Sequence, residues 1–167
     1  MSVWFFLLAQ FTLLAYALVG GVFLAFSDFI MRSLAHTDGI GGIEAMQVIN
    51  REVFRWIFMS LFLGLALVSI LVFGCSMVHL SGPGASLIAP ADVIYFIGCF
   101  GVMIAFNVPT NQALAGMDLS DDLTRDYWHR VYVPRWTLWN TVRTMACAVS
   151  STLLMVGLLW MAQTHSA

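Results

Sequence analysis

The chain has 167 residues, of which 60% are hydrophobic and only 10% are charged, whereas soluble domains carry about 25% charged residues. This composition excludes an ordinary soluble enzyme and a disordered chain, and a formal net charge of −2 with no lysine leaves no basic surface for nucleic acid. The length fits a single domain over residues 1–167. The mean hydropathy of +0.88 indicates an integral membrane protein whose main partner is the lipid bilayer.

Four apolar stretches reach the length of about 20 residues that a membrane-crossing helix needs. They cover residues 3–26, 54–78, 93–114 and 136–161 approximately. Because lipid admits only helices or closed barrels, we expect an all-α fold, an integral membrane four-helix bundle. The first stretch lacks a positively charged start and is longer than a signal-peptide core of about 7–15 residues, so we expect it to be a permanent span.

The arginines are distributed unevenly between the connections. Six of the seven lie in the connection between the first two stretches or in that between the last two: Arg32, Arg51, Arg55, Arg125, Arg130 and Arg135. The connection around Gly82 and both termini carry none. The positive-inside rule therefore predicts a multi-pass protein of the cell membrane (the inner membrane of a Gram-negative cell), with the Arg-bearing connections in the cytoplasm and both termini outside.

Polar side chains gather toward the cytoplasmic ends of all four stretches. They include Ser27, Gln47, Asn50, Asn107, Asn111, Trp139, Asn140 and Arg143. We expect almost nothing comparable in the outer halves beyond Asp92, which we interpret as a helix cap. Polarity on one side predicts a pocket open to the cytoplasmic interface, and it disfavours a transporter, which needs polar residues through the full membrane depth.

Arg143 is the most costly of these residues to bury. It lies about seven residues into the fourth stretch, roughly 10 Å deep, and an arginine at the bilayer centre costs about 2.5–3.5 kcal/mol on insertion scales. One reading is an arginine that snorkels, or that joins helices through asparagines and carbonyls. We favour the other, a functional group, because intramembrane ionisable residues are functional by default.

An aromatic and polar series leads to this arginine. Trp128, Tyr132, Trp136, Asn140 and Arg143 recur every three or four residues and so lie on one face of a helix. Such a series is more often packing than a cofactor site. Because this one ends in an amide and a guanidinium, we interpret it as the flat wall of a cavity with polar anchors at depth.

The segment Asn107–Asn111 places two amides one turn apart, with Pro109 between them. The proline frees the Ala105 carbonyl, which protein groups or water must then satisfy inside a membrane. The segment marks either a structural kink or a water-accessible cavity, and its residues leave both readings open. In a ligand site the amides would orient the ligand or stabilise an oxyanion.

Two acids lie near this end of the chain. Asp28 and Glu52 are spaced to form helix-surface ion pairs with Arg32 and Arg55, and we favour that reading for both. The four histidines lie in different connections and termini without metal-ligand spacing, so we expect no metal and no cofactor. Cys75, Cys99 and Cys147 are scattered in apolar runs and are expected to be small buried side chains.

Four sequence elements follow one another in order over nearly the whole chain: Phe26–Met31 (FSDFIM), Met46–Asn50 (MQVIN), Asn107–Leu114 (NVPTNQAL) and the series from Trp128 to Arg143. With these elements the chain resembles the anthrone-oxygenase-like family of small four-span membrane proteins. Asp28 occupies an open position of the family pattern. Some fungal members oxidise anthrones to anthraquinones with molecular oxygen, so the resemblance implies a possible oxygenase.

The resemblance implies roles for particular residues. The catalytic oxyanion donors would be Arg143, Asn140, Asn107 and Asn111, and the substrate-binding residues would be Trp136, Trp139, Tyr132, Ser27, Gln47 and Asn50. The reaction would use no cofactor, on a flat aromatic or phenolic substrate, with water or Glu52 as the base. The alternative is a non-enzymatic membrane module that binds a lipid, a quinone or a partner helix in the same pocket. A closed slot of about 300 Å³ or more would favour the oxygenase.

Overall fold

The computed structural model describes residues 2–53 and 57–166, without the side chains of residues 164–166. The described residues form helices and short connections, as expected for an all-α protein. Four helical stretches are long and apolar enough to cross a membrane: Val3–Ala35, Ile57–His79, Ala85–Ala115 and Asp122–Gln163. They indicate a multi-pass membrane protein. The expected start of the second span, residues 54–56, lies outside the described residues.

The first stretch is one long helix with a π-helical turn. It consists of α1 (Val3–Ala25), the π turn η1 (Phe26–Ile30) and α2 (Met31–Ala35), and α3 (Gly41–Glu52) follows after a bend. Ser2 caps α1, because its Oγ accepts a hydrogen bond from the Phe5 N–H at 3.2 Å. Gly39 has φ +63 in the bend, a conformation that favours glycine. The chain thereby reverses and brings α3 back toward the centre.

The second and third stretches form an antiparallel pair. α4 (Ile57–His79) leads through a turn at Gly82, whose φ is +92, into α5 (Ala85–Tyr95). Two π turns follow, η2 (Phe96–Gly101) and η3 (Met103–Asn107), and then α6 (Val108–Ala115). The third helix therefore begins about eight residues before the expected start at residue 93. Pro90 and Asp92 lie within α5, so the interpretation of Asp92 as a cap was wrong.

The fourth stretch is the longest. It consists of α7 (Asp122–Tyr127), the π turn η4 (Trp128–Tyr132) and α8 (Val133–Ser166). Asp121 caps its start by accepting the Leu123 N–H at 2.9 Å. Its 42 residues from Asp122 to Gln163 span about 63 Å at 1.5 Å per residue, roughly twice the hydrocarbon thickness of a bilayer. This helix therefore extends well beyond the apolar core of the membrane.

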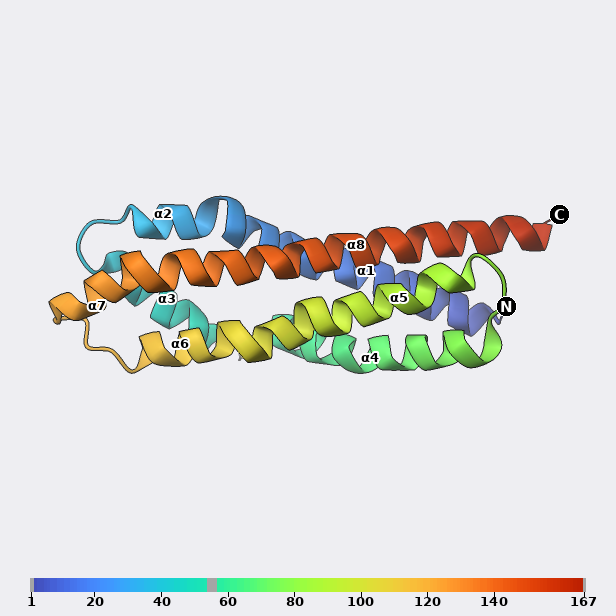
Figure 1. The fold of residues 1–167 in the computed structure, drawn as a ribbon, viewed down its shortest axis with the longest axis horizontal. Coiled ribbons are helices and arrows are strands. Elements are labelled where there is room, and N and C mark those ends of the chain that lie inside the picture. The colour runs from blue at the N-terminus through green and yellow to red at the C-terminus, as the bar shows by residue number, and fades with distance from the viewer. Residues whose placement is uncertain (1, 54–56, 167) are drawn as a thin grey trace.

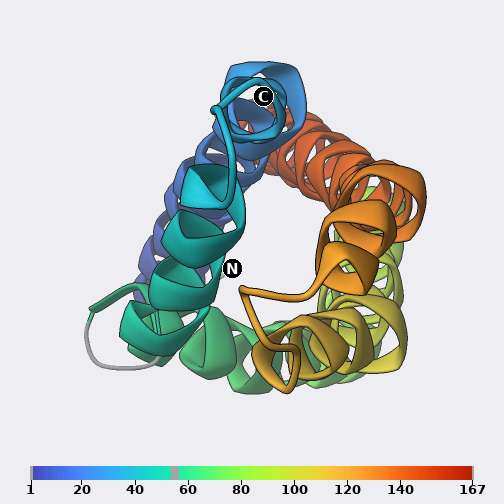
Figure 2. The same cartoon turned by 90° about the vertical axis from the view of Figure 1, so that its left-hand side faces the viewer.

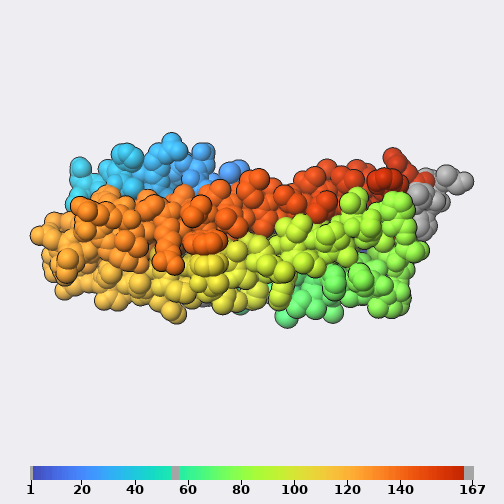
Figure 3. Space-filling model, viewed as in Figure 1, coloured from blue at the N-terminus to red at the C-terminus, as the bar shows by residue number. Residues whose placement is uncertain are grey.

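The four stretches lie side by side along one long axis (Figure 1), and the space-filling view shows the same elongated body (Figure 3). Both termini and the turn at Gly82 lie at one end, while the connections from α2 to α3 and from α6 to α7 lie at the other (Figure 1). The view along the axis shows the helices arranged around a common centre (Figure 2). The two Arg-bearing connections thus share one end of the molecule.

Small residues allow the helices to approach closely. A Cβ at Gly20 of α1 would meet the Cys147 Cβ of α8 at 2.8 Å, and one at Gly98 would meet the Ala146 Cβ at 2.8 Å. Small residues at helix contacts are typical of membrane proteins, in which dispersion and close packing replace the hydrophobic effect between helices. The side chains form two buried clusters, one in the half that holds the termini and one at the Arg-bearing end.

Candidate functional site

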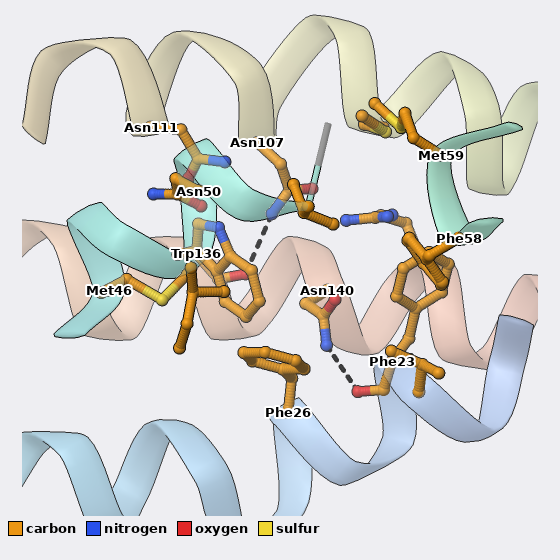
Figure 4. A pocket seen from close by; sticks show the side chains of 15 residues that line it. Phe23, Phe26, Met46, Asn50, Phe58, Met59, Asn107, Asn111, Trp136 and Asn140 are labelled. Carbon is orange, nitrogen blue, oxygen red and sulfur yellow. Dashed lines mark hydrogen bonds between the residues drawn. The ribbon is translucent and has the colours of Figure 1, made fainter. Parts of the chain in front are cut away.

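A cavity of about 130 Å³ lies between the two buried clusters. Figure 4 shows side chains from several helices converging on it. Its lining consists of Val22, Phe23, Phe26, Met46, Ile49, Asn50, Val53, Phe58, Met59, Met103, Asn107, Asn111, Trp136, Asn140 and Arg143. Most of these side chains are apolar, and the polar ones are four asparagines, a tryptophan and an arginine. Six of the ten residues predicted for the site line the cavity: Asn50, Asn107, Asn111, Trp136, Asn140 and Arg143.

Arg143 lies on α8 and is only 5% exposed. Its guanidinium carbon lies 3.7 Å from the centroid of the Phe23 ring and 5.7 Å from that of Phe62, close enough for a cation–π interaction. No carboxylate belongs to the cavity lining, and its Nε has no hydrogen-bond partner among the described residues. An unpaired buried charge is costly, and the lining contains no carboxylate that would pair with this guanidinium.

Two asparagines are fixed in orientation by backbone carbonyls. The Asn140 Nδ2 donates to the Phe23 carbonyl at 2.6 Å and to the Ser27 Oγ at 2.7 Å. The Asn107 Nδ2 donates to the Trp136 carbonyl at 3.4 Å. A carbonyl accepts only from the amide nitrogen, so neither amide can be flipped. The Oδ1 atoms of both, and the Trp136 Nε1, are buried without a partner in the part of the chain that the structure describes.

A second polar group closes the Arg-bearing side of the cavity. The Asn50 Nδ2 donates to the Tyr132 hydroxyl at 3.3 Å, and this hydroxyl donates to the Asn111 Oδ1 at 2.8 Å. The Tyr132 ring is stacked on Trp128, with ring centroids 5.1 Å apart. This chain joins α3, η4 and α6, and it holds Asn50 and Asn111 at the cavity.

The other four predicted residues lie around the cavity rather than in its lining. Gln47 donates to the Leu114 carbonyl at 2.9 Å and so ties α3 to the end of α6. Trp139 stacks on Phe106, with centroids 3.7 Å apart. Ser27 and Tyr132 reach the lining through hydrogen bonds to asparagines.

The aromatic series on the fourth stretch is buried along its whole length. Trp128, Tyr132, Trp136, Asn140 and Arg143 are each 6% exposed or less, in agreement with a single inward face. The π turn η4 precedes Pro134, and the π turn η3 precedes Pro109. π turns are frequent at functional sites. The helix continues from η3 into α6 across Pro109, and Asn107 and Asn111 both line the cavity.

The apolar part of the lining was not predicted. Phe23, which covers the guanidinium, and Phe26, whose ring centroid lies 5.6 Å from that of Trp136, come from the first stretch. Phe58 and Met59 come from the start of α4. One signal was present: Tyr16 and Phe23 are seven residues apart and share a helix face. In a stretch that is apolar throughout, hydropathy did not distinguish this face from the lipid-facing one.

The half of the protein that holds the termini also contains a buried acid. Asp92 is 1% exposed, and its Oδ1 accepts a hydrogen bond from the Tyr16 hydroxyl at 2.8 Å. The Tyr16 and Tyr95 rings are stacked, with centroids 4.1 Å apart. The expectation of an outer half almost without polar groups was wrong, and the argument drawn from it against transport loses its basis. Unlike Arg143, Asp92 has a close hydrogen-bond partner.

Two cysteines lie close to Arg143. Cys99 and Cys147 are buried free thiols with sulfurs 3.4 Å apart, and both lie near the guanidinium.

The ion pairs and the metal site were also considered from the sequence. Asp28 forms no ion pair with Arg32 in the described ranges, so that expectation was wrong. The pairing expected for Glu52 involves Arg55, which lies outside the described residues. No three His, Cys, Asp or Glu side chains among the described ones come together as a metal site.

Comparison with known proteins gives one match. The model of a family described as anthrone oxygenase matches residues 50–153. This range covers more than half of the chain and includes eight of the ten predicted site residues. No curated protein and no solved structure matches.

Proposed function

The chain belongs to the anthrone oxygenase family, and we propose that it is an integral membrane oxygenase that oxidises a flat, phenolic substrate without a bound cofactor. The proposed form is one four-helix membrane domain over residues 1–167. In this arrangement the Arg-bearing end faces the cytoplasm and both termini face outward. The cavity then lies near the cytoplasmic interface.

One observation carries the proposal. The buried guanidinium of Arg143 borders a cavity whose lining supplies no anion. Asn107, Asn111 and Asn140 line the same cavity. Both Nδ2 hydrogens of Asn140 are taken by Phe23 and Ser27, so Asn140 acts by holding helices around the cavity. The donors left for an oxyanion are the Arg143 guanidinium and the Trp136 Nε1–H, which has no partner among the described residues. Donors fixed before the substrate arrives stabilise an oxyanion that develops during a reaction, so this site suits a substrate that becomes an anion as it reacts.

The proposed chemistry follows from the acidity of such a substrate. A CH2 group flanked by aromatic rings and conjugated to a carbonyl loses a proton to give an anion whose charge lies largely on oxygen. This anion passes electrons to O2, and a carbon–oxygen bond forms. The distal oxygen takes up a proton, and the resulting hydroperoxide loses water. The net change converts CH2 and O2 to C=O and H2O. Trp136 and Phe26 would enclose the ring, while Arg143 would hold the oxygen.

The proposed reaction needs a base that removes the first proton. The cavity lining contains no carboxylate and no histidine. Glu52 is exposed at the end of α3 and does not line the cavity. We therefore propose that water at the cavity mouth accepts the proton, since the anion that it leaves is stabilised by the guanidinium.

The test is oxygen uptake by the purified protein in lipid nanodiscs with a panel of anthrones and phenols. We expect uptake in equal amounts with ketone formation, and a loss of at least about 100-fold in Arg143→Ala, because removal of one oxyanion donor costs about 2.7–4 kcal/mol. Arg130→Gln, at an exposed residue of η4, is the matched control and should keep full activity. No uptake with any member of the panel, or full activity in Arg143→Ala, contradicts the proposal.

The volume of the cavity supports a second candidate function. About 130 Å³ is less than half of the 300 Å³ from which ligand pockets commonly start. A non-enzymatic module needs a cavity that holds only its ligand, a small lipid-soluble molecule or a headgroup, whereas an oxygenase must hold its substrate and O2 together. Native mass spectrometry of the detergent-extracted protein distinguishes the two: a retained ligand that remains unchanged under oxygen supports the module.

A further inference from the structure

Two buried thiols contact each other between the third and fourth stretches. Cys99 lies on η2 and Cys147 on α8, both are buried, and their sulfurs are 3.4 Å apart. The backbones also approach closely here, since a Cβ at Gly98 would meet the Ala146 Cβ at 2.8 Å. A disulfide bond is about 2.05 Å long, so a small rotation of the two side chains is enough to form one.

The guanidinium of Arg143 connects this thiol pair to the cavity. It donates a hydrogen bond to the Cys99 sulfur, and Arg143 also lines the cavity. Met103 follows Cys99 by about one helical turn and lines the cavity as well. An oxygen atom that binds the N–H groups of this guanidinium from the cavity is therefore brought close to the Cys99 sulfur.

The groups around the guanidinium differ in their chemistry. They are the Cys99 and Cys147 thiols and the Tyr95 hydroxyl. A cation beside a thiol favours the thiolate, which is the nucleophilic form of cysteine. Among these neighbours, the thiols are the groups that peroxides oxidise by two electrons. The surroundings of Arg143 thus combine a site for an oxygen atom with a thiol pair that can reduce a peroxide.

The reduction of a hydroperoxide by two thiols proceeds in two steps. A thiolate attacks the outer oxygen of ROOH, the O–O bond breaks, the cysteine becomes a sulfenic acid, and RO⁻ takes up a proton and leaves as the alcohol ROH. The second thiol then attacks the sulfenic sulfur, the disulfide forms and water leaves. In sum, ROOH and two thiols give ROH, one disulfide and H2O, so the hydroperoxide gains the two electrons that the thiols lose.

We propose that Cys99 and Cys147 form a thiol pair that reduces organic hydroperoxides bound in the Arg143 cavity, with Cys99 as the nucleophile and Cys147 as its disulfide partner. The inference rests on the proposed function in one respect: that reaction passes through a hydroperoxide at Arg143. A hydroperoxide that does not lose water there is a substrate for the thiols, and the product is an alcohol.

The composition of the lining gives this reduction a protective role. Met46, Met59 and Met103 all line the cavity, and oxidation converts methionine to a polar sulfoxide that disrupts apolar packing. Thiols that consume a hydroperoxide first spare these side chains. The proposal therefore predicts that the thiols are oxidised before the methionines.

The test supplies the hydroperoxide directly and needs no turnover of the oxygenase. The reduced protein in nanodiscs, freed of reductant under nitrogen, is mixed with an equal amount of cumene hydroperoxide, which is aromatic and lipid-soluble. We expect cumyl alcohol in an amount equal to the protein, the loss of two hydrogen atoms from the protein mass, and a proteolytic fragment that links Cys99 to Cys147. Dithiothreitol should restore the original mass. Methionine sulfoxide with both thiols intact overturns the proposal.

Variants assign the roles within the pair. Cys147→Ser should stop at a sulfenic acid on Cys99, which dimedone traps. Arg143→Met should slow disulfide formation at least about tenfold, because the cation that favours the thiolate is lost. Cys75→Ala, at the third free thiol on α4, is the matched control and should form the same disulfide at the same rate. An equal rate in Arg143→Met overturns the role of the cavity, and the linked fragment from the wild type decides the case if Cys147→Ser fails to fold.

These outcomes are separable from those of the oxygen-uptake test. If cumene hydroperoxide produces the disulfide but no anthrone or phenol consumes oxygen, the oxygenase proposal fails and the thiol pair stands. If an anthrone is oxidised and cumene hydroperoxide leaves both thiols intact, the oxygenase proposal stands and the inference about the thiols fails.

Discussion

The two halves of this protein bury charged residue types in different ways. In the half with the termini, Asp92 accepts a hydrogen bond from Tyr16 at 2.8 Å and both residues are fully packed. At the boundary with the Arg-bearing half, Arg143 borders a cavity and pairs with no anion of its lining. The first arrangement joins helices α1 and α5 through one carboxylate oxygen, while the other, Oδ2, has no partner among the described residues. Both residues also adjoin a cavity, so the difference between them is the tyrosine hydroxyl that binds the carboxylate.

The largest effect should come from Arg143→Met, which separates activity from stability. Methionine has a similar reach without the charge, so we expect oxygen uptake to fall at least about 100-fold. The free energy of unfolding should stay equal or rise, since apolar replacement of buried charges is often neutral or stabilising. Oxygen uptake and chemical unfolding in detergent measure both effects. A large loss of stability would instead show that Arg143, like Asp92, serves mainly to hold helices together.

Tyr16→Phe tests the other half. It removes the donor to Asp92 and leaves a buried carboxyl group without its partner, at a cost of about 1–3 kcal/mol. Chemical unfolding should show this loss, and oxygen uptake should be unchanged. Tyr127→Phe is the control, because the Tyr127 hydroxyl forms no hydrogen bond with the described residues. A loss of oxygen uptake in Tyr16→Phe would show that the two halves are coupled.

Tyr132→Phe should have a smaller effect in the Arg-bearing half. It removes the hydroxyl that accepts from Asn50 and donates to Asn111, and we expect a loss of about 1 kcal/mol in stability. Activity should fall less than in Arg143→Met, because the asparagines remain but are less firmly held. Unfolding and oxygen uptake measured on the same preparation check this. Unchanged stability would mean that this hydrogen-bonded chain does not hold α3 against α6.

The smallest effect should arise outside the membrane, at Asp118. The Ser120 N–H and hydroxyl donate to its carboxylate at 2.9 and 2.8 Å and hold its pKa below the ordinary value. A carboxyl whose pKa is lower in the folded state contributes stability above its unfolded pKa, and this contribution disappears as pH falls through the folded pKa. Asp118→Asn should therefore flatten the acid side of the unfolding profile slightly. An unchanged profile would show that the turn at residues 118–120 adds nothing to stability.

The four long helices were predictable because hydropathy over about 20 residues is a strong signal. Their ends were less so. The third helix begins at Ala85 instead of near residue 93, since Pro90 and Asp92 resemble a helix start although they lie inside α5. Because the helix start was placed near residue 93, the sequence analysis did not recognise Asp92 as a buried acid. A carboxyl group at a helix start is a cap, but the same group one turn further in must find a partner such as Tyr16.

The polar part of the site was predictable, and the apolar part was not. Asn107, Asn140 and Arg143 stand out in apolar stretches, and all three line the cavity. Phe23 and Phe58 line it equally, but nothing distinguishes them from the phenylalanines that face lipid. Trp139 was predicted to bind the substrate together with Trp136, yet its ring stacks on Phe106 outside the cavity lining. The volume depends on how these rings pack, which sequence spacing does not determine.

Val22 lines the cavity and is 40% exposed, so we expect this wall of the chamber to adjoin the acyl chains of a surrounding bilayer. A compound dissolved in the leaflet can therefore arrive sideways, without first entering water. Its concentration per volume of lipid, rather than per volume of buffer, then sets occupancy. Apparent affinities measured at different lipid-to-protein ratios should coincide only after correction for partitioning.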